Sequence, residues 1–145
     1  MVDVSVKKIT FRTATASGIV VLGREVIQTI QSSENLSKKG DVVTVSKVAG
    51  IMAAKSTSSL IPLTHQVPLS HVSVDIELAP ETGTASVICS AKTSSQTGVE
   101  MEAMTGVTVA CLTLYDMCKS INKGIIIKDI RLVKKSGGKS DFKLD

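Results

Sequence analysis

The chain has 145 residues, of which 43% are hydrophobic and 21% charged, and its mean hydropathy is +0.26. A disordered chain combines low hydrophobicity with high net charge, so this composition indicates one folded domain spanning residues 1–145. One Tyr, two Phe and no Trp exclude the aromatic platforms on which most single-strand RNA and DNA binders depend. The net charge of +4 is explained equally well by solubility and by a site for an anionic ligand.

The cysteines indicate a reducing compartment, and the apolar segments indicate that no part of the chain crosses a membrane. Cys89, Cys111 and Cys118 form no C-x-x-C pair and are odd in number, which argues against a zinc site or a disulfide framework. The N-terminus lacks the apolar region of a signal peptide, and the longest uncharged apolar stretch, 103–115, is shorter than the ~20 residues that cross a bilayer. We therefore expect a soluble cytoplasmic protein with reduced, mostly buried thiols.

The first half of the chain predicts one strand and two helices. After a flexible tail, the expected elements are a strand at 10–22, a short helix at 24–34, a basic loop at 37–40 and a second helix at 42–52. Asp41 is a suitable N-cap for the second helix. Residues 42–45 alone would also suit a strand, but the three- and four-residue spacing of the apolar residues favours the helix.

The second half predicts a hairpin, a long helix and a last strand. The expected elements are strands at 70–78 and 85–91 joined by a turn at 79–83, a helix at 99–123, a strand at 125–133 and a basic tail. The middle of the long helix is apolar on nearly every side, which is typical of a helix buried in the fold or against another subunit. The order of elements predicts an α+β fold, an antiparallel sheet with helices on one face, with residues 1–9 and 136–145 flexible.

Two segments concentrate candidate binding residues. The proline-bearing loop at 60–66 contains His65; a lone histidine is usually structural, but one in a stiffened loop entering a sheet is a better candidate for binding. The long helix begins with Glu100 and Glu102, which point about 200° apart on a regular helix. They face one pocket only if the first turn is irregular; otherwise they serve different surfaces or simply stabilise the helix N-terminus.

The end of the long helix places Asp116 and Lys119 on one face, three residues apart. A surface ion pair explains this spacing, and so does proton transfer, if the apolar helix lowers the local dielectric and shifts both pKa values. Glu102 and Asp116 lie 14 residues apart, or about 21 Å along the axis. If both ends are functional, we expect a site that combines the helix start of one protomer with the helix end of another.

The basic segment 134–140 ends in Gly138-Lys139-Ser140 but lacks the first glycine of a P-loop and a following helix, so it is not a Walker A motif. Its flexible backbone N–H groups and ammonium ions suit phosphate oxygens, although ordinary solvated tails share this composition. The two histidines and the scattered carboxylates show no metal-ligand spacing, so no metal site is expected.

Four segments in order resemble the molybdenum cofactor biosynthesis protein C family, the cyclic pyranopterin monophosphate synthases. They are LIPLTH at 60–65, TGVEMEAMT at 97–105, LYDMCK at 114–119 and RLVKKSGGKS at 131–140. The resemblance implies a ferredoxin-like fold and a homo-oligomer, a hexamer built as a trimer of dimers with sites at subunit interfaces. It also implies a lyase that converts 3',8-cyclo-7,8-dihydroguanosine 5'-triphosphate to cyclic pyranopterin monophosphate and releases pyrophosphate.

The resemblance also implies residue roles. Asp116 and Lys119 match the family's catalytic aspartate and lysine, an acid and base for ring opening and closure. The residues that it implies for substrate binding are Leu63, Thr64, His65, Met101, Glu102, Glu100, Lys39, Lys135 and Arg12. The cations among them would hold the triphosphate and offset the charge of departing pyrophosphate. No cofactor is implied, and whether Mg²⁺ accompanies the triphosphate stays open.

The chain departs from the family pattern at three positions. Thr64 and Gln66 stand where the family loop usually has cysteine and proline, and Asp141 stands where a glycine usually follows Ser140. Binding through backbone groups and His65 requires none of the replaced side chains.

Two alternatives to this enzyme remain from the sequence. One is a basic ferredoxin-like module that binds nucleic acid, which the missing aromatic residues oppose. The other is a paralogue that keeps the oligomer but has lost activity, which the presence of Asp116 and Lys119 opposes.

Overall fold

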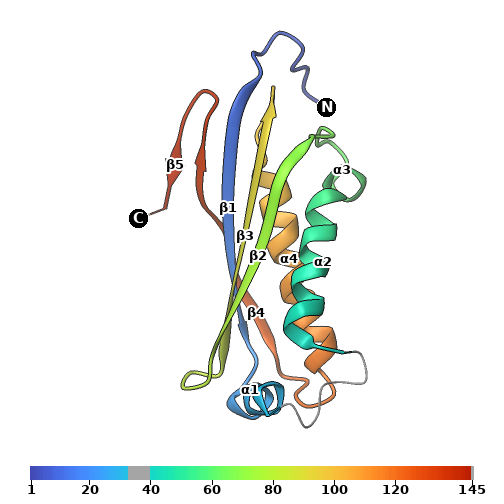
Figure 1. Cartoon of the computed structure of the whole chain (residues 1–145), viewed down its shortest axis with the longest axis vertical. Helices are drawn as coiled ribbons and strands as arrows, with labels where there is room; N and C mark the ends of the chain where they lie inside the picture. Colours follow the sequence, from blue (N-terminus) through green and yellow to red (C-terminus); the bar gives the residue numbers. More distant parts are fainter. Residues whose placement is uncertain (33–39, 145) are drawn as a thin grey trace.

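The computed structural model describes residues 1–32 and 40–144, which form one antiparallel sheet with its helices (Figure 1). The strands are β1 (Thr10–Val21), β2 (Leu69–Ala79), β3 (Thr84–Ser95), β4 (Ile126–Ser136) and β5 (Phe142–Lys143). The helices are α1 (Arg24–Gln31), α2 (Val42–Lys55), α3 (Thr57–Leu60) and α4 (Glu100–Cys118). The sheet order is β2-β3-β1-β4-β5, and α2 and α4 cover one face. Its first four strands have the ferredoxin-like order, so the expected α+β fold is confirmed.

The long helix ends earlier than predicted. It stops at Cys118, whose carbonyl accepts the N–H groups of Ile121 and Asn122, so the expected extent to residue 123 is wrong. The Asn122 side chain explains the stop, because its amide donates to the Leu22 carbonyl and its oxygen accepts from the Gly124 N–H. These bonds turn the chain toward β4 instead of continuing the helix.

The last long strand continues further than predicted. β4 reaches Ser136, and its residues 134–136 pair with residues 13–15 of β1, so the start of the basic segment is strand and not flexible chain. β5 then pairs with the end of β4. Pairing with β1 overrides the polar sequence of this segment, which by itself gave no strand signal.

Close contact between α2 and α4 fixes the long helix on the sheet. A Cβ atom on Gly50 would lie 2.8 Å from the Gly106 carbonyl, and one on Gly106 would lie 2.5 Å from Cys89 Sγ. Both glycines therefore allow α4 to pack tightly between α2 and β3. Cys89, Cys111 and Cys118 are buried free thiols, and burial raises the pKa of Cys89 to about 12.

Candidate active site

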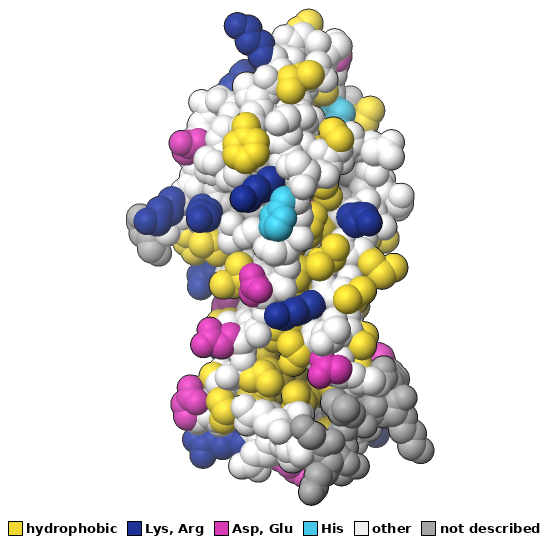
Figure 2. Space-filling model, in the orientation of Figure 1, with side chains coloured by type: hydrophobic (Ala, Val, Ile, Leu, Met, Phe, Trp, Pro, Cys, Tyr) yellow, Lys and Arg dark blue, Asp and Glu magenta, His cyan; other side chains and the backbone are white. Residues whose placement is uncertain are grey.

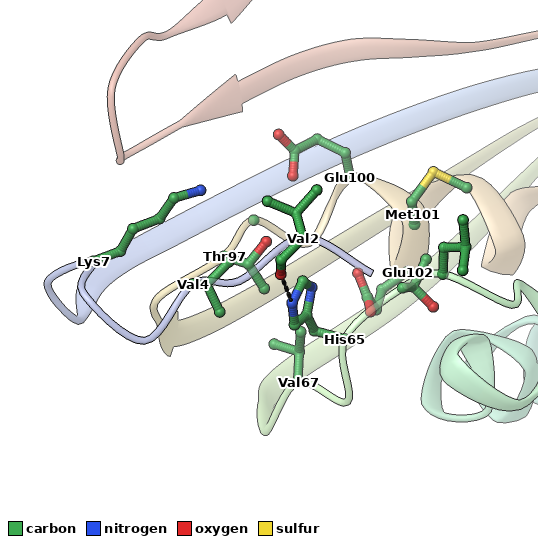
Figure 3. A pocket seen from close by; sticks show the side chains of 12 residues that line it. Val2, Val4, Lys7, His65, Val67, Thr97, Glu100, Met101 and Glu102 are labelled. Carbon is green, nitrogen blue, oxygen red and sulfur yellow. Dashed lines mark hydrogen bonds between the residues drawn. The ribbon is translucent and has the colours of Figure 1, made fainter.

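A cavity of about 410 Å³ lies where the start of α4, the loop before β2 and the N-terminal segment meet (Figure 3). Six of the residues predicted for substrate binding line it: Leu63, Thr64, His65, Glu100, Met101 and Glu102. Segments far apart in the sequence thus meet at one place, and the volume falls within the range of small-molecule sites.

The loop that carries His65 is fixed at both ends. The backbone N–H and the hydroxyl of Thr64 both donate to the Ile61 carbonyl, at 3.3 and 2.9 Å. At the other end, the buried Thr93 hydroxyl on β3 donates to the Pro68 carbonyl, at 2.7 Å. These bonds hold the loop against the sheet, so His65 faces the cavity from a restrained backbone.

The N-terminal segment forms another wall of the cavity. Val2, Val4 and Lys7 line it, and the Val2 carbonyl lies 2.7 Å from Nε2 of His65. These three residues are not among those predicted, because the sequence of residues 1–9 indicates a flexible tail. The alternation of apolar residues at positions 2, 4 and 6 was the available signal. Val67, Thr97 and Gly98 complete the lining. Thr97 and Gly98 belong to the motif segment 97–105, but none of the three was predicted to bind substrate.

Glu100 and Glu102 both line the cavity, although they leave the start of α4 in different directions (Figure 3). The cavity lies at the end of the helix, where side chains that leave the first turn in different directions both reach its wall. The expectation that a regular helix keeps the two carboxylates out of one pocket is therefore wrong. Glu102 is 4% exposed; burial raises its pKa, and the negative charge of Glu100 raises it further.

Two of the predicted cations lie close to this cavity. Nζ of Lys135 on β4 forms an ion pair with Oε1 of Glu100, at 3.0 Å. Arg12 on β1 donates from Nε to the Ser95 carbonyl and from Nη2 to the Gln96 carbonyl, at 3.1 and 3.0 Å. Arg12 also lines a neighbouring basic cavity of about 450 Å³, together with Val6, Lys7, Lys8, Thr10, Gly138 and Lys139.

The glycines after β4 pass close to the start of β1 before the chain turns back as β5. Gly137 and Gly138 have φ values of +86° and +84°, and a Cβ on Gly137 would lie 2.1 Å from the Phe11 carbonyl. The departure at Asp141 has a structural role here, because its Oδ1 accepts a hydrogen bond from the Gly137 N–H, at 3.0 Å. The carboxylate thus closes the turn that leads to β5.

The predicted catalytic pair lies at the other end of α4. Lys119 Nζ lies 2.7 Å from Asp116 Oδ1, and the hydrogen bond to Asp116 raises the pKa of Lys119. The two side chains are 52% and 46% exposed, so a single chain does not supply the low dielectric that was expected around them. The helical rise places Asp116 about 21 Å from Glu102 along the axis. Lys39, also predicted for binding, lies outside the described residues.

Neither a cluster of metal ligands nor a membrane-spanning helix occurs in the part of the chain that the structure describes. Within 1–32 and 40–144, no three His, Cys, Asp or Glu side chains are grouped so that they could hold a metal ion. None of the helices described in these ranges has the length and apolar character needed to span a membrane.

Comparison with known proteins assigns the chain to a family. The model of the MoaC family matches residues 1–138. The chain belongs to this family.

MoaC relatives match nearly the whole chain. The cyclic pyranopterin monophosphate synthase of Parvibaculum lavamentivorans is 49% identical over 99% of this chain and 89% of its own length. That of Geobacter metallireducens is 51% identical over 97% of this chain and 86% of its own length. The mitochondrial synthase of Arabidopsis thaliana is 52% identical over 97% of this chain, which covers 51% of that relative. The family resemblance that the sequence motifs indicated is therefore confirmed.

Replacing Glu102 should change how stability depends on pH. Because the pKa of Glu102 is raised in the folded state, its stabilising contribution is present below the ordinary value of 4.5 and is lost as pH rises through the folded value. The Glu102→Gln variant carries a neutral amide at this position. We therefore expect its free energy of unfolding to increase relative to that of the wild type as pH increases from 4 to 7. Urea unfolding at several pH values measures this difference. A constant difference across this range would contradict the raised pKa.

Proposed function

We propose that this chain is a cyclic pyranopterin monophosphate synthase. It converts 3',8-cyclo-7,8-dihydroguanosine 5'-triphosphate to cyclic pyranopterin monophosphate and pyrophosphate, and is a phosphorus–oxygen lyase. The observation that carries this proposal is the cavity at the start of α4, which unites the loop of His65 with Glu100 and Glu102 in a chain about half identical to named synthases. No specific observation favours the nucleic-acid-binding alternative.

The last part of this reaction defines what the site must supply. A sugar hydroxyl oxygen bonds to the α-phosphorus while the bond from that phosphorus to pyrophosphate breaks. The hydroxyl proton passes to a base, and the departing pyrophosphate carries the negative charge. Asp116 and Lys119 supply the acid and base, because the pair places a carboxylate that can accept a proton beside an ammonium group that can donate one. Lys135 and Arg12 supply positive charge for the phosphates.

The cavity walls suit the guanine-derived ring. This ring presents adjacent N–H donors and a carbonyl acceptor along one edge. Glu102 and His65 offer a carboxyl and an imidazole to these groups, while Met101 and Leu63 offer apolar contact area. Because Glu102 is nearly buried, its hydrogen bonds to the ring are little weakened by water.

Assembly completes the site in this proposal. The pair Asp116 and Lys119 lies about 21 Å along α4 from the cavity, so another protomer supplies it. Apolar side chains that need a covering surface are exposed on both long helices: Val45, Val48 and Met52 on α2 and, 55% exposed, Leu112 on α4. Figure 2 shows hydrophobic side chains gathered over α2 and the neighbouring β2. We assign the protein as a homohexamer, a trimer of dimers, with sites at subunit interfaces. Its buried thiols suit a reducing compartment, the cytoplasm.

The direct test is turnover of the cyclised nucleotide. The purified protein is incubated with enzymatically prepared 3',8-cyclo-7,8-dihydroguanosine triphosphate, and pyrophosphate and the pterin chromophore are measured. We expect both products in equal amounts, and neither from GTP. An unchanged nucleotide would overturn the proposal, and tight binding of single-stranded RNA without competition by triphosphate would favour the nucleic-acid module.

Asp116→Asn should leave assembly unchanged and lower turnover by at least ~100-fold, the usual scale for loss of a general acid–base group. The measurement is kcat together with the oligomeric state from light scattering. The matched control is Asp75→Asn, which makes the same change at an exposed aspartate on β2 and should keep kcat within about twofold. Wild-type turnover of Asp116→Asn would remove the assigned role.

Lys135→Ala should mainly weaken binding of the triphosphate. A charge-assisted contact contributes about 1.5–3 kcal/mol, so we expect KM to rise roughly ten- to a hundredfold with a smaller change in kcat. Lys134→Ala is the control, because this neighbouring lysine points to the other side of β4 and is exposed. Equal KM values for the two variants would reject a phosphate contact at Lys135.

A further inference from the structure

Two hydrogen bonds hold the N-terminal segment against the rest of the chain, and a third closes a turn within it. The Val2 carbonyl bonds to His65 Nε2 at 2.7 Å, which Figure 3 shows as a dashed line. The Ser5 carbonyl accepts from Nε2 of Gln96, at 3.3 Å. Around Ser5, the Lys7 N–H donates to the Val4 carbonyl at 2.9 Å and closes a turn. The segment is thus anchored at its turn and contacts His65 at its tip.

The bond between Val2 and His65 determines which nitrogen carries the imidazole hydrogen. A backbone carbonyl accepts hydrogen bonds and cannot donate them, so the hydrogen must be on Nε2 of His65. In the neutral ring this leaves the lone pair on Nδ1, which is then the acceptor available to other groups. The same bond also restricts rotation of the ring.

Gln96 joins the N-terminal segment to the sheet. Its side-chain amide donates to the Ser5 carbonyl, while its own carbonyl accepts from Nη2 of Arg12, at 3.0 Å. Arg12 is itself tied to the end of β3 through the Ser95 carbonyl. Gln96 is half-buried and is not among the residues that line the cavity. Its side chain therefore acts on the cavity through the segment that it holds.

We propose that the N-terminal segment positions His65 for the reaction, with the Val2 carbonyl fixing the Nε2–H form and Gln96 as the positioning residue that anchors the segment. This inference rests on the proposed function, because it makes His65 a substrate-binding group whose orientation matters. The loop bonds of Thr64 restrain the backbone of His65, and the segment restrains its ring. Neither set of bonds fixes the imidazole alone.

Gln96→Leu tests the anchor, because it removes the amide donor at nearly the same side-chain size. The first readout is the side-chain nitrogen NMR spectrum of the ligand-free protein. We expect His65 to be in the Nε2–H form with an observable Hε2 proton in the wild type. Exposed His71 in the same spectrum serves as the internal reference for an unrestrained ring. In Gln96→Leu the Hε2 signal of His65 should weaken and its nitrogen shifts should move toward those of His71.

The second readout is the kinetics with the cyclised nucleotide. Loss of one net hydrogen bond should raise KM for Gln96→Leu about three- to tenfold, whereas Gln28→Leu, an exposed site on α1, should match the wild type. Unchanged His65 signals in Gln96→Leu would overturn the anchor, and altered signals with wild-type kinetics would overturn the positioning role. If the wild type is inactive but Gln96→Leu still changes the His65 signals, the proposed function is refuted and the anchoring role of Gln96 is retained.

Discussion

The length of α4 is the constraint on which the rest of the account depends. One helix carries Glu102 in its first turn and Asp116 in its last, and the rise of an α-helix separates them by about 21 Å. The close approach of Gly50 and Gly106 packs this helix between α2 and the sheet, so bending cannot bring its ends together. A reaction that needs both ends must therefore take them from different chains.

One pair of opposite charges at the cavity is formed within the chain itself. Lys135 is neutralised by Glu100, and the partial positive end of α4 is next to the same carboxylate. A triphosphate bound at Lys135, as proposed, would compete with Glu100 for this cation, and the carboxylate would lose its partner. Glu102 differs because burial favours its neutral form, which can donate as well as accept hydrogen bonds.

The sequence predicted the features that local patterns determine. Strict alternation located the hairpin of β2 and β3, and the motif segments located six residues of the cavity. The misses depend on contacts between distant segments. The end of β4 is strand because it pairs with β1, and the N-terminal segment lines the cavity because His65 and Gln96 hold it. The two glutamates share a pocket because that pocket lies at a helix end, which helical periodicity does not reveal.

Complementation between two defective variants tests the shared site most directly. His65→Ala removes a group at the cavity and Asp116→Asn removes one at the far end of α4, and each variant alone should be nearly inactive. When the two variants are mixed 1:1 and pair at random, about half of the dimers contain one chain of each variant. In each mixed dimer one of the two sites takes both of its groups from unaltered positions and is intact. We therefore expect about a quarter of wild-type turnover. Turnover no greater than the sum of the separate variants would show that each site lies within one chain.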